Sequence, residues 1–279
     1  MFKQKGEPMP NAMIAQWRLH THQLSGTTSA TPAEVVGRLG AVQAQDYPGA
    51  LWTIGLRAHQ ATVATVEQAI AEGKIVRTWP MRGTLHFVSA ADVRWMLALL
   101  TPRVIAGSRR RHAQLELDET TLGRGKELLV KALEGGKRLT RQELMAVLEQ
   151  AGIATANQRG YHLLGWAAQT GLICFGPMQA KQPTFVLLDE WAPAAKALTR
   201  EEALAAVTMR YFCGHGPATL ADFMWWTGLL AADARAGLAM VSSQLVQEEH
   251  AGQRYWLGPE AANRPSLANR CSLLPGFDE

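Results

Sequence analysis

One short order of elements recurs three times along the chain: capped helices, and then two apolar strands around a turn. In the first copy, the spacing of apolar residues predicts helices over 11–24, from Thr31 onward and over 63–71. Strands are predicted over 75–79 and 83–88, on either side of a turn. Three helices followed by a hairpin are the order of a winged helix-turn-helix unit. We therefore predict tandem units of that kind.

The second and third copies both begin with a capping box, in which a threonine and a glutamate three residues later satisfy backbone N–H groups at a helix start. These boxes are Thr140 with Glu143 and Thr199 with Glu202. The second copy continues with a helix over 156–170 and a hairpin with Lys181 at its tip. The third continues with helices from Pro217 and over 233–245, and with the remnant of a wing over 253–257. The predicted fold class is mainly α with small β wings (α+β).

Between the first and second copies the pattern predicts two bracing helices, over 89–100 and 102–115. A chain of 279 residues with 47% hydrophobic residues can bury the cores of three small domains. We predict a first unit over 1–115 that includes the bracing helices, a second unit over 116–195 and a third over 196–279.

The sequence gives no sign of a membrane span, a metal or a cofactor. The longest apolar stretches, such as 95–100, are too short to cross a bilayer, and no apolar leader is visible at the start of the chain. Cys174, Cys213 and Cys271 fit neither a disulfide framework nor paired-cysteine zinc spacing, so we expect reduced thiols. Glycine-rich phosphate loops and metal-binding motifs do not occur. These observations predict a cytoplasmic protein with no cofactor and no metal.

Positive charge is concentrated in the first part of the chain. Residues 1–112 hold thirteen Lys and Arg against six Asp and Glu, whereas residues 113–279 hold fifteen against eighteen. A local surplus of this kind can neutralise phosphates, and the release of their counterions drives association with DNA. An ordinary solvated charged face is the alternative. The candidate arginines are Arg77, Arg82, Arg94, Arg103, Arg109, Arg110 and Arg111.

Two glutamines follow an amphipathic stretch over 32–39, and we expect the segment Tyr47-Pro48-Gly49 after them to stop any helix. In a helix, residues two positions apart point in nearly opposite directions, but in an extended chain they share a face. If the chain unwinds near Val42, Gln43 and Gln45 therefore present their amides together. The alternative is that both side chains only satisfy local carbonyl groups at the end of a helix.

The glutamine segment resembles the Gln-x-Gln motif of the AlkZ/YcaQ-like DNA glycosylases. The resemblance covers Gln43-Ala44-Gln45, then Asp46-Tyr47-Pro48 and residues 51–57, and continues in order through 77–86, 216–226 and 273–278. Family members are built from tandem winged helices, so the resemblance supports the predicted fold and implies a concave basic surface. Because they normally continue beyond the last of these segments, we expect the third unit to be C-terminally truncated.

The resemblance implies a monofunctional DNA glycosylase that acts in base excision repair on alkylation damage. Its substrates would be N-alkylated purines of the N7-alkylguanine type in double-stranded DNA, and interstrand crosslinks are a further candidate. Such a purine is positively charged and leaves readily, so neutral amides suffice. Gln43 and Gln45 are predicted to be catalytic: they hold the attacking water and stabilise the cationic sugar. Asp46 is a stronger base, but it should point to the opposite face.

DNA contacts are predicted from residues at the tips of the wings and on a bracing helix. Arg77, Arg82 and His86 surround the tip of the first wing, and Lys181 occupies the tip of the second. The bracing helix over 102–115 contributes a run of three basic residues: Arg109, Arg110 and Arg111. We expect a monomer associated with the nucleoid. The alternative function is a non-catalytic winged-helix DNA-binding protein or transcription regulator, which would leave alkylated DNA intact.

Overall fold

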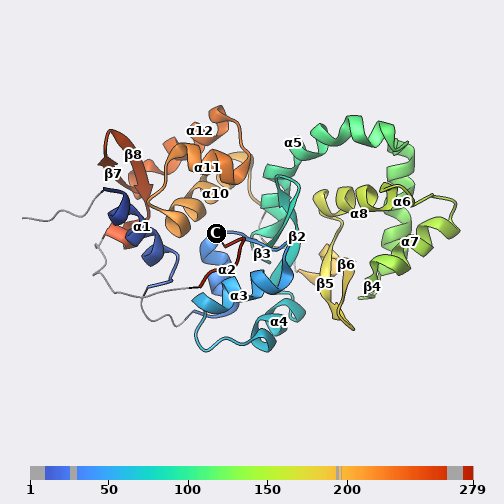
Figure 1. Ribbon diagram of the computed structural model, residues 1–279. Helices are drawn as coiled ribbons and strands as arrows, with labels where there is room; N and C mark the ends of the chain where they lie inside the picture. The colour runs from blue at the N-terminus through green and yellow to red at the C-terminus, as the bar shows by residue number, and fades with distance from the viewer. Residues whose placement is uncertain (1–9, 26–29, 193–194, 196, 263–272, 279) are drawn as a thin grey trace, which may run out of the picture.

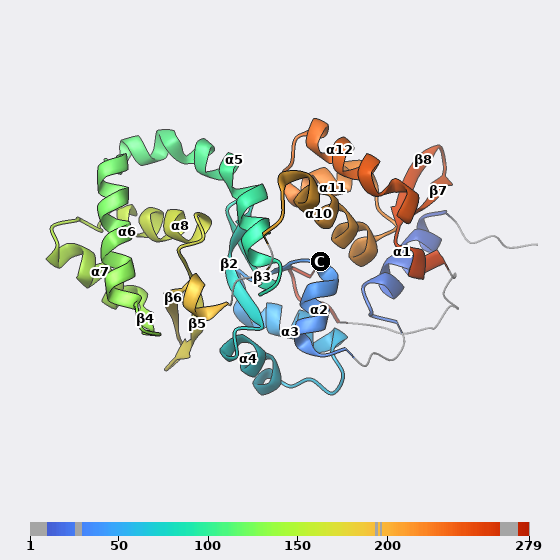
Figure 2. The same cartoon turned by 180° about the vertical axis from the view of Figure 1, so that it is seen from behind.

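The computed structural model describes residues 10–25, 30–192, 195, 197–262 and 273–278. The first unit lies in the middle of the molecule, with the second on one side and the third on the other (Figures 1 and 2). None of the helices in the described ranges is long and apolar enough to cross a bilayer.

The three units share one order of elements: helix, short strand, two helices and a hairpin. In the first unit these are α2 (Pro32–Leu39), β1 (Val42–Gln43), α3 (Tyr47–Arg57), α4 (Val63–Ala71), β2 (Ile75–Met81) and β3 (Thr84–Ser89). In the second they are α6 (Glu119–Leu133), β4 (Leu139–Thr140), α7 (Arg141–Gln150), α8 (Arg159–Gln169), β5 (Ile173–Gln179) and β6 (Gln182–Leu187). In the third, α10 (Arg200–His215), α11 (Leu220–Thr227), α12 (Ala231–Val241), β7 (Val246–His250) and β8 (Gln253–Leu257) follow this order, and a bridge from Ala218 to Trp256 replaces the short strand.

The capping residues set the helix starts that the sequence predicts. Thr31, Thr140 and Thr199 each accept the backbone N–H three residues on, and the glutamate there accepts the threonine N–H in return. The hydrogen bonds from Thr31 also lower the pKa of Glu34. Thr219 and Asp222 form a further capping box at the start of α11.

The first two units are joined through a single antiparallel sheet. Its strand order is β1-β3-β2-β5-β6-β4, so each half repeats the other in reverse. The halves meet where Arg77 of β2 pairs with Phe175 of β5. Backbone pairing therefore links two segments that are far apart in the sequence, and it brings the first hairpin against the second unit.

Three apolar clusters form the core of the part of the chain that the structure describes. One lies inside the first unit around Val36, Ile54 and Phe87, and a second lies inside the second unit but also takes in Trp79 from β2. The third cluster joins the strands of the first hairpin to helix α5 (Val93–Gln114) and to the helices of the third unit, with Met96 and Phe212 among its members. Because two of the clusters cross unit boundaries, the units pack as one body.

Two helix predictions were wrong. Helix α5 runs without a break and has Pro102 in its interior, where the sequence predicted a boundary between two helices. A proline in a helix interior removes one backbone hydrogen bond and crowds the preceding turn. Packing of Leu99 and Leu100 in the core holds that turn in place. Tyr47-Pro48-Gly49 was expected to stop a helix, yet it begins α3, since proline is favoured in the first helical turn.

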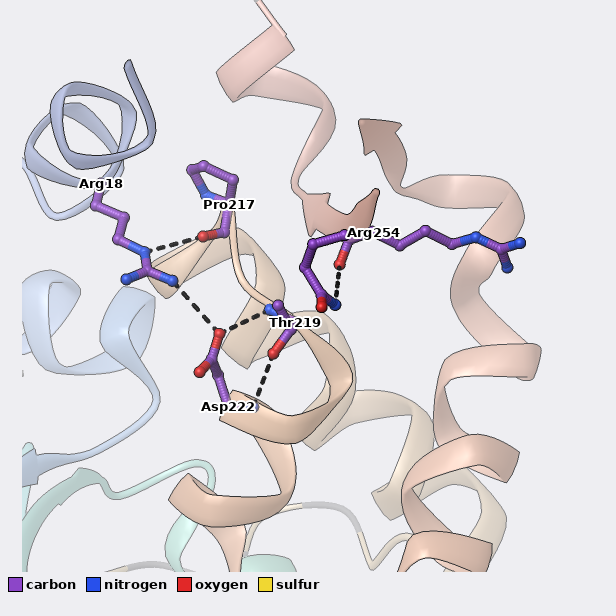
Figure 3. Close-up of polar contacts among 6 residues, drawn as sticks. Arg18, Pro217, Thr219, Asp222 and Arg254 are labelled. Atoms are coloured by element: carbon purple, nitrogen blue, oxygen red, sulfur yellow. Dashed lines mark hydrogen bonds and ion pairs between the residues drawn. The ribbon is translucent and has the colours of Figure 1, made fainter. Parts of the chain in front are cut away.

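Helix α1 (Pro10–Thr21) belongs by sequence to the first predicted unit, but it packs against α10 of the third. Arg18 donates from Nε to the Pro217 carbonyl oxygen (3.0 Å) and from Nη2 to Asp222 Oδ2 (3.4 Å), as Figure 3 shows. Asp222 Oδ2 also accepts the Thr219 N–H, so one carboxylate oxygen takes part in both the ion pair and the capping box of α11. Helix α9 (Leu188–Trp191) and the 3-10 turns Ser242–Gln244 and Pro259–Ala262 complete the described elements.

Candidate active site at the glutamine motif

The chain leaves helical geometry just before the two glutamines. Helix α2 ends at Gly40, whose φ of +78° is open to glycine and strained for other residues. Val42 and Ala44 are fully buried, whereas Gln43 is half-buried and Gln45 is exposed. This alternation fits an extended segment at the edge of a sheet. Val42 and Gln43 pair with β3, and the Ala44 N–H donates to the Leu85 carbonyl oxygen at 2.8 Å.

The two amide side chains lie against each other. Gln43 Nε2 donates to Gln45 Oε1 at 3.1 Å. The spacing of two residues therefore puts both amides on one side of the chain, as the sequence predicted for an extended segment. An amide pair of this kind offers both donors and acceptors at one point of the surface.

Arg77 holds the backbone between the two glutamines. Its guanidinium donates from Nε (3.0 Å) and Nη2 (2.5 Å) to the Ala44 carbonyl oxygen. The group lies between the rings of Tyr47 and Phe175, with Cζ 5.3 Å and 5.0 Å from their centroids. Burial lowers the pKa of Arg77 to about 10, so its charge persists at neutral pH. Only 7% of the residue is exposed, so its guanidinium is not available for the phosphate contact that the sequence predicted.

We expect Arg77→Met to slow excision about tenfold, the loss that follows from removing hydrogen bonds to a charged group. The slope of DNA affinity against salt concentration should stay unchanged, because a buried guanidinium releases no counterions. The measurement is fluorescence anisotropy of a labelled duplex across a salt series, beside single-turnover excision. Lys181→Met, at an exposed position, is the matched control, since loss of a phosphate contact lowers the slope by about 1. If the salt slope of DNA affinity falls in Arg77→Met, Arg77 contacts a phosphate after all.

His86 lies beside Gln43 in the sheet and away from the solvent. It is fully buried in β3, where it is the strand partner of both Gln43 and Thr78. Directly paired residues of antiparallel strands share a face, so these three side chains form a polar row across β1, β3 and β2. His86 Nδ1 lies 3.0 Å from the Thr84 carbonyl oxygen. The predicted place at the wing tip therefore needs correction: His86 is enclosed within the sheet.

Asp46 follows the motif and precedes α3. It is exposed and makes no side-chain capping hydrogen bond. A Cβ at Gly49 would lie 2.5 Å from Asp46 Oδ2 and 3.4 Å from Pro275 Cβ, so the carboxylate lies over the first turn of the helix. Glycine at position 49 permits this close approach.

The segment 273–278 fixes the other end of α3. Arg57 is fully buried and forms a bidentate ion pair with Asp278, through Nη1–Oδ1 (2.9 Å) and Nη2–Oδ2 (2.6 Å). The Arg57 guanidinium also donates to the carbonyl oxygens of His22 and Thr53. Trp52 Nε1 donates to the Leu273 carbonyl oxygen at 3.1 Å. The sequence reasoning did not single out Arg57, although a charged residue at the end of the apolar run 51–57 was a signal.

The tip of the first hairpin reaches the third unit. Arg82 stands in the β2–β3 turn at φ +53°, and its Cζ lies 4.9 Å from the centroid of the Trp225 ring. Arg82 Nη1 also donates to the Trp225 carbonyl oxygen at 3.4 Å, and Arg103 on α5 donates to the Gly228 carbonyl oxygen at 2.9 Å. Trp225 is 75% exposed, so a cation and a solvent-facing indole lie together at this junction.

The remaining candidate DNA contacts lie on the second unit or beside it. Arg109, Arg110 and Arg111 are exposed on the last turns of α5, and Arg111 Nη2 donates to Gln158 Oε1 at 2.9 Å. Lys181 is exposed in the β5–β6 turn at φ +67°. The end of α5 and this turn lie at opposite ends of the second unit (Figures 1 and 2). The structure therefore does not bring these cations together at one point.

Two of the three cysteines lie in the described part of the chain. Cys174 and Cys213 are free thiols, and burial raises the pKa of both. Both sulfurs therefore stay protonated at neutral pH, and neither is a reactive thiolate. The remaining cysteine, Cys271, lies outside the described residues.

Comparisons with known proteins agree with the geometry of this chain. The family model for AlkZ-like DNA glycosylases matches residues 36–279. An interstrand DNA cross-link repair glycosylase of Streptomyces sahachiroi is 27% identical over 287 residues, which cover 95% of this chain and 75% of the relative. The solved structure of the Streptomyces sahachiroi DNA glycosylase AlkZ superposes with a TM-score of 0.76 at 24% identity and covers 90% of this chain and 70% of that one.

The family match includes the paired glutamines, both hairpins of the six-stranded sheet and the segment that carries Asp278. The mixed α+β architecture agrees with the fold of the solved relative. This chain belongs to the AlkZ-like family of DNA glycosylases.

Proposed function

We propose that this protein is a monofunctional DNA glycosylase that hydrolyses the N-glycosidic bond of N7-alkylguanine-type purines in double-stranded DNA. The observation that carries the proposal is the Gln43–Gln45 amide pair, hydrogen-bonded at 3.1 Å on a backbone that Arg77 fixes. The Streptomyces sahachiroi relative is named for interstrand cross-link repair. We extend the proposal to crosslinked purines on that ground.

The reaction needs little acid catalysis because the alkylated purine is already cationic. The oxygen of water forms a bond to C1′ as the bond from C1′ to the purine N9 breaks, and the electron pair of that bond leaves with the base and neutralises it. The water then gives up a proton to the solvent. The amide oxygens of Gln43 and Gln45 can accept hydrogen bonds from the water and face the positive charge that develops on the sugar. Their task is positioning and electrostatic stabilisation.

DNA would be held by the exposed cations and the hairpin turns. We assign Arg82, Arg109, Arg110, Arg111 and Lys181 to phosphate contacts, in three winged-helix units over 1–115, 116–195 and 196–279, of which the third also holds α1 against α10. Arg77 and His86 have positioning roles in this scheme, because both side chains are buried. A repair enzyme of this kind would work on the nucleoid in the cytoplasm as a monomer.

The proposal is tested on a duplex with one N7-methylguanine. Incubation with the protein followed by hot alkali should cleave the strand at the lesion, because hydrolysis leaves an abasic site that alkali breaks. Omission of the alkali should leave the strand whole, since a monofunctional enzyme does not nick it. Spontaneous depurination in a parallel sample gives the background rate. A duplex that stays intact at the background rate would indicate a DNA-binding protein without catalysis.

A further inference from the structure

A cavity of about 510 Å³ lies between the first and second units, next to the glutamine motif. Strands β2 and β5 run beside it, since they are paired at Arg77 and Phe175. Its walls include Gln45, Arg77, Trp79, Tyr161, Phe175 and Phe185. A pocket of this volume falls in the range of about 300–1,000 Å³ that holds drug-sized ligands. The space is therefore larger than the methyl group of a simple lesion needs.

Aromatic rings form much of the wall. Trp79 meets Phe175 at 5.1 Å between centroids, and Phe175 meets Phe185 at 4.5 Å. Tyr161 on α8 stands edge-on to Trp79, at 6.3 Å and 86°. Trp79, Phe175 and Phe185 are nearly fully buried, so Tyr161 is the ring of this set that can meet a further flat ring through offset-stacked or edge-to-face contacts. Tyr161 is 52% exposed, so the ring is not needed to fill the core of the second unit.

One charged group in the wall is buried and fixed. The guanidinium of Arg77 cannot move to leave the cavity, because it is bonded to the Ala44 carbonyl oxygen and lies between two rings. A buried positive charge disfavours a second cation nearby. A cationic N7-alkylpurine therefore suits this cavity less well than a neutral ring does.

We propose that this cavity binds a flat, uncharged aromatic group carried by the alkyl lesion, while Gln43 and Gln45 act at the sugar of the same nucleotide. Gln45 belongs to both the amide pair and the cavity wall, so an aromatic arm attached to the purine has only a short distance to reach. The inference rests on the proposed function, and it makes bulky aromatic adducts preferred substrates over small ones.

The test compares two duplexes, one with N7-methylguanine and one with N7-benzylguanine at the same position. For each protein the readout is the ratio of the benzyl to the methyl excision rate, each corrected for spontaneous depurination. Tyr161→Ala should lower this ratio about fivefold, the factor expected for the loss of one aromatic pair. Tyr161→Phe keeps the ring and should keep the ratio.

The outcomes separate this inference from the proposed function. Rates of Tyr161→Ala that fall by equal factors with both duplexes would place the purine itself in the cavity and overturn the proposal, and so would two rates that both stay at the parent value. Fluorescence anisotropy with the same duplexes measures the ratio of the two affinities without any catalysis. If the parent protein excises neither base, the proposed function fails, and a weakened preference for the benzyl duplex in Tyr161→Ala still supports the aromatic site.

Discussion

Replacement of Gln45 by alanine should slow the excision of N7-methylguanine about a hundredfold, and Gln43→Ala should have a similar effect. Removal of one preorganised polar group from a site where charge develops costs about 10²–10³ in rate. Because the two amides are hydrogen-bonded to each other, each also holds its neighbour in place. The double variant should therefore lose less than the product of the two single losses. Single-turnover excision with enzyme in excess measures the chemical step.

Gln68→Ala is the matched control for the glutamine variants. Gln68 is an exposed glutamine of the same unit, on α4, and its side chain donates locally to Glu72 at 2.9 Å. This variant should excise at the parent rate. DNA affinity should change little in Gln43→Ala and Gln45→Ala, since neither side chain is charged. Parent rates in both motif variants would exclude the amide pair from the mechanism.

Asp278→Ala should lower the free energy of unfolding by about 3–5 kcal/mol, the loss that follows when a buried ion pair is broken from one side. The reason is that Arg57 is fully buried and would keep its charge without a counterion. Urea denaturation followed by tryptophan fluorescence measures the change through the midpoint and slope of the transition. Excision should fall as well, because α3 begins directly after the glutamine motif.

The exposed pair Arg200–Asp233 provides the control for the buried one. Its side chains are 54% and 27% exposed, and Asp233→Ala should cost less than about 1 kcal/mol. The double variant Arg57→Met with Asp278→Leu should recover much of the stability that Asp278→Ala loses, since it leaves no unpaired charge. An unchanged urea midpoint in Asp278→Ala would show that the segment 273–278 does not hold α3 in solution.

The sequence predicted the features that depend on neighbouring residues. The capping boxes at Thr31, Thr140 and Thr199 and the helix over 63–71 were confirmed, because three-residue spacings and local apolar patterns determine them. The paired glutamine amides follow from the same local rule of alternation in an extended chain. The rule that proline ends a helix gave two wrong predictions. Pro48 lies in the first turn of a helix, and Pro102 lies within one.

Features that depend on distant residues could not be predicted. Arg77 belongs to the basic surplus of the first part of the chain, which predicted a DNA contact. Its burial becomes evident only when β2 pairs with β5 and Phe175 covers it. His86 is enclosed for a similar reason, since both flanking strands are needed to cover it. The ion pair of Arg57 with Asp278 spans 221 positions, and no local pattern connects its two members.

The shared sheet has a mechanical consequence for the way a duplex is engaged. The first two hairpins, which lie beside the glutamine motif, are tied directly by backbone pairing at the Arg77–Phe175 register. A continuous sheet of that kind resists hinge motion between the first two units. We therefore expect a bound duplex to deform more than the protein does, and sites where the damage has already softened the stack should be bound most readily.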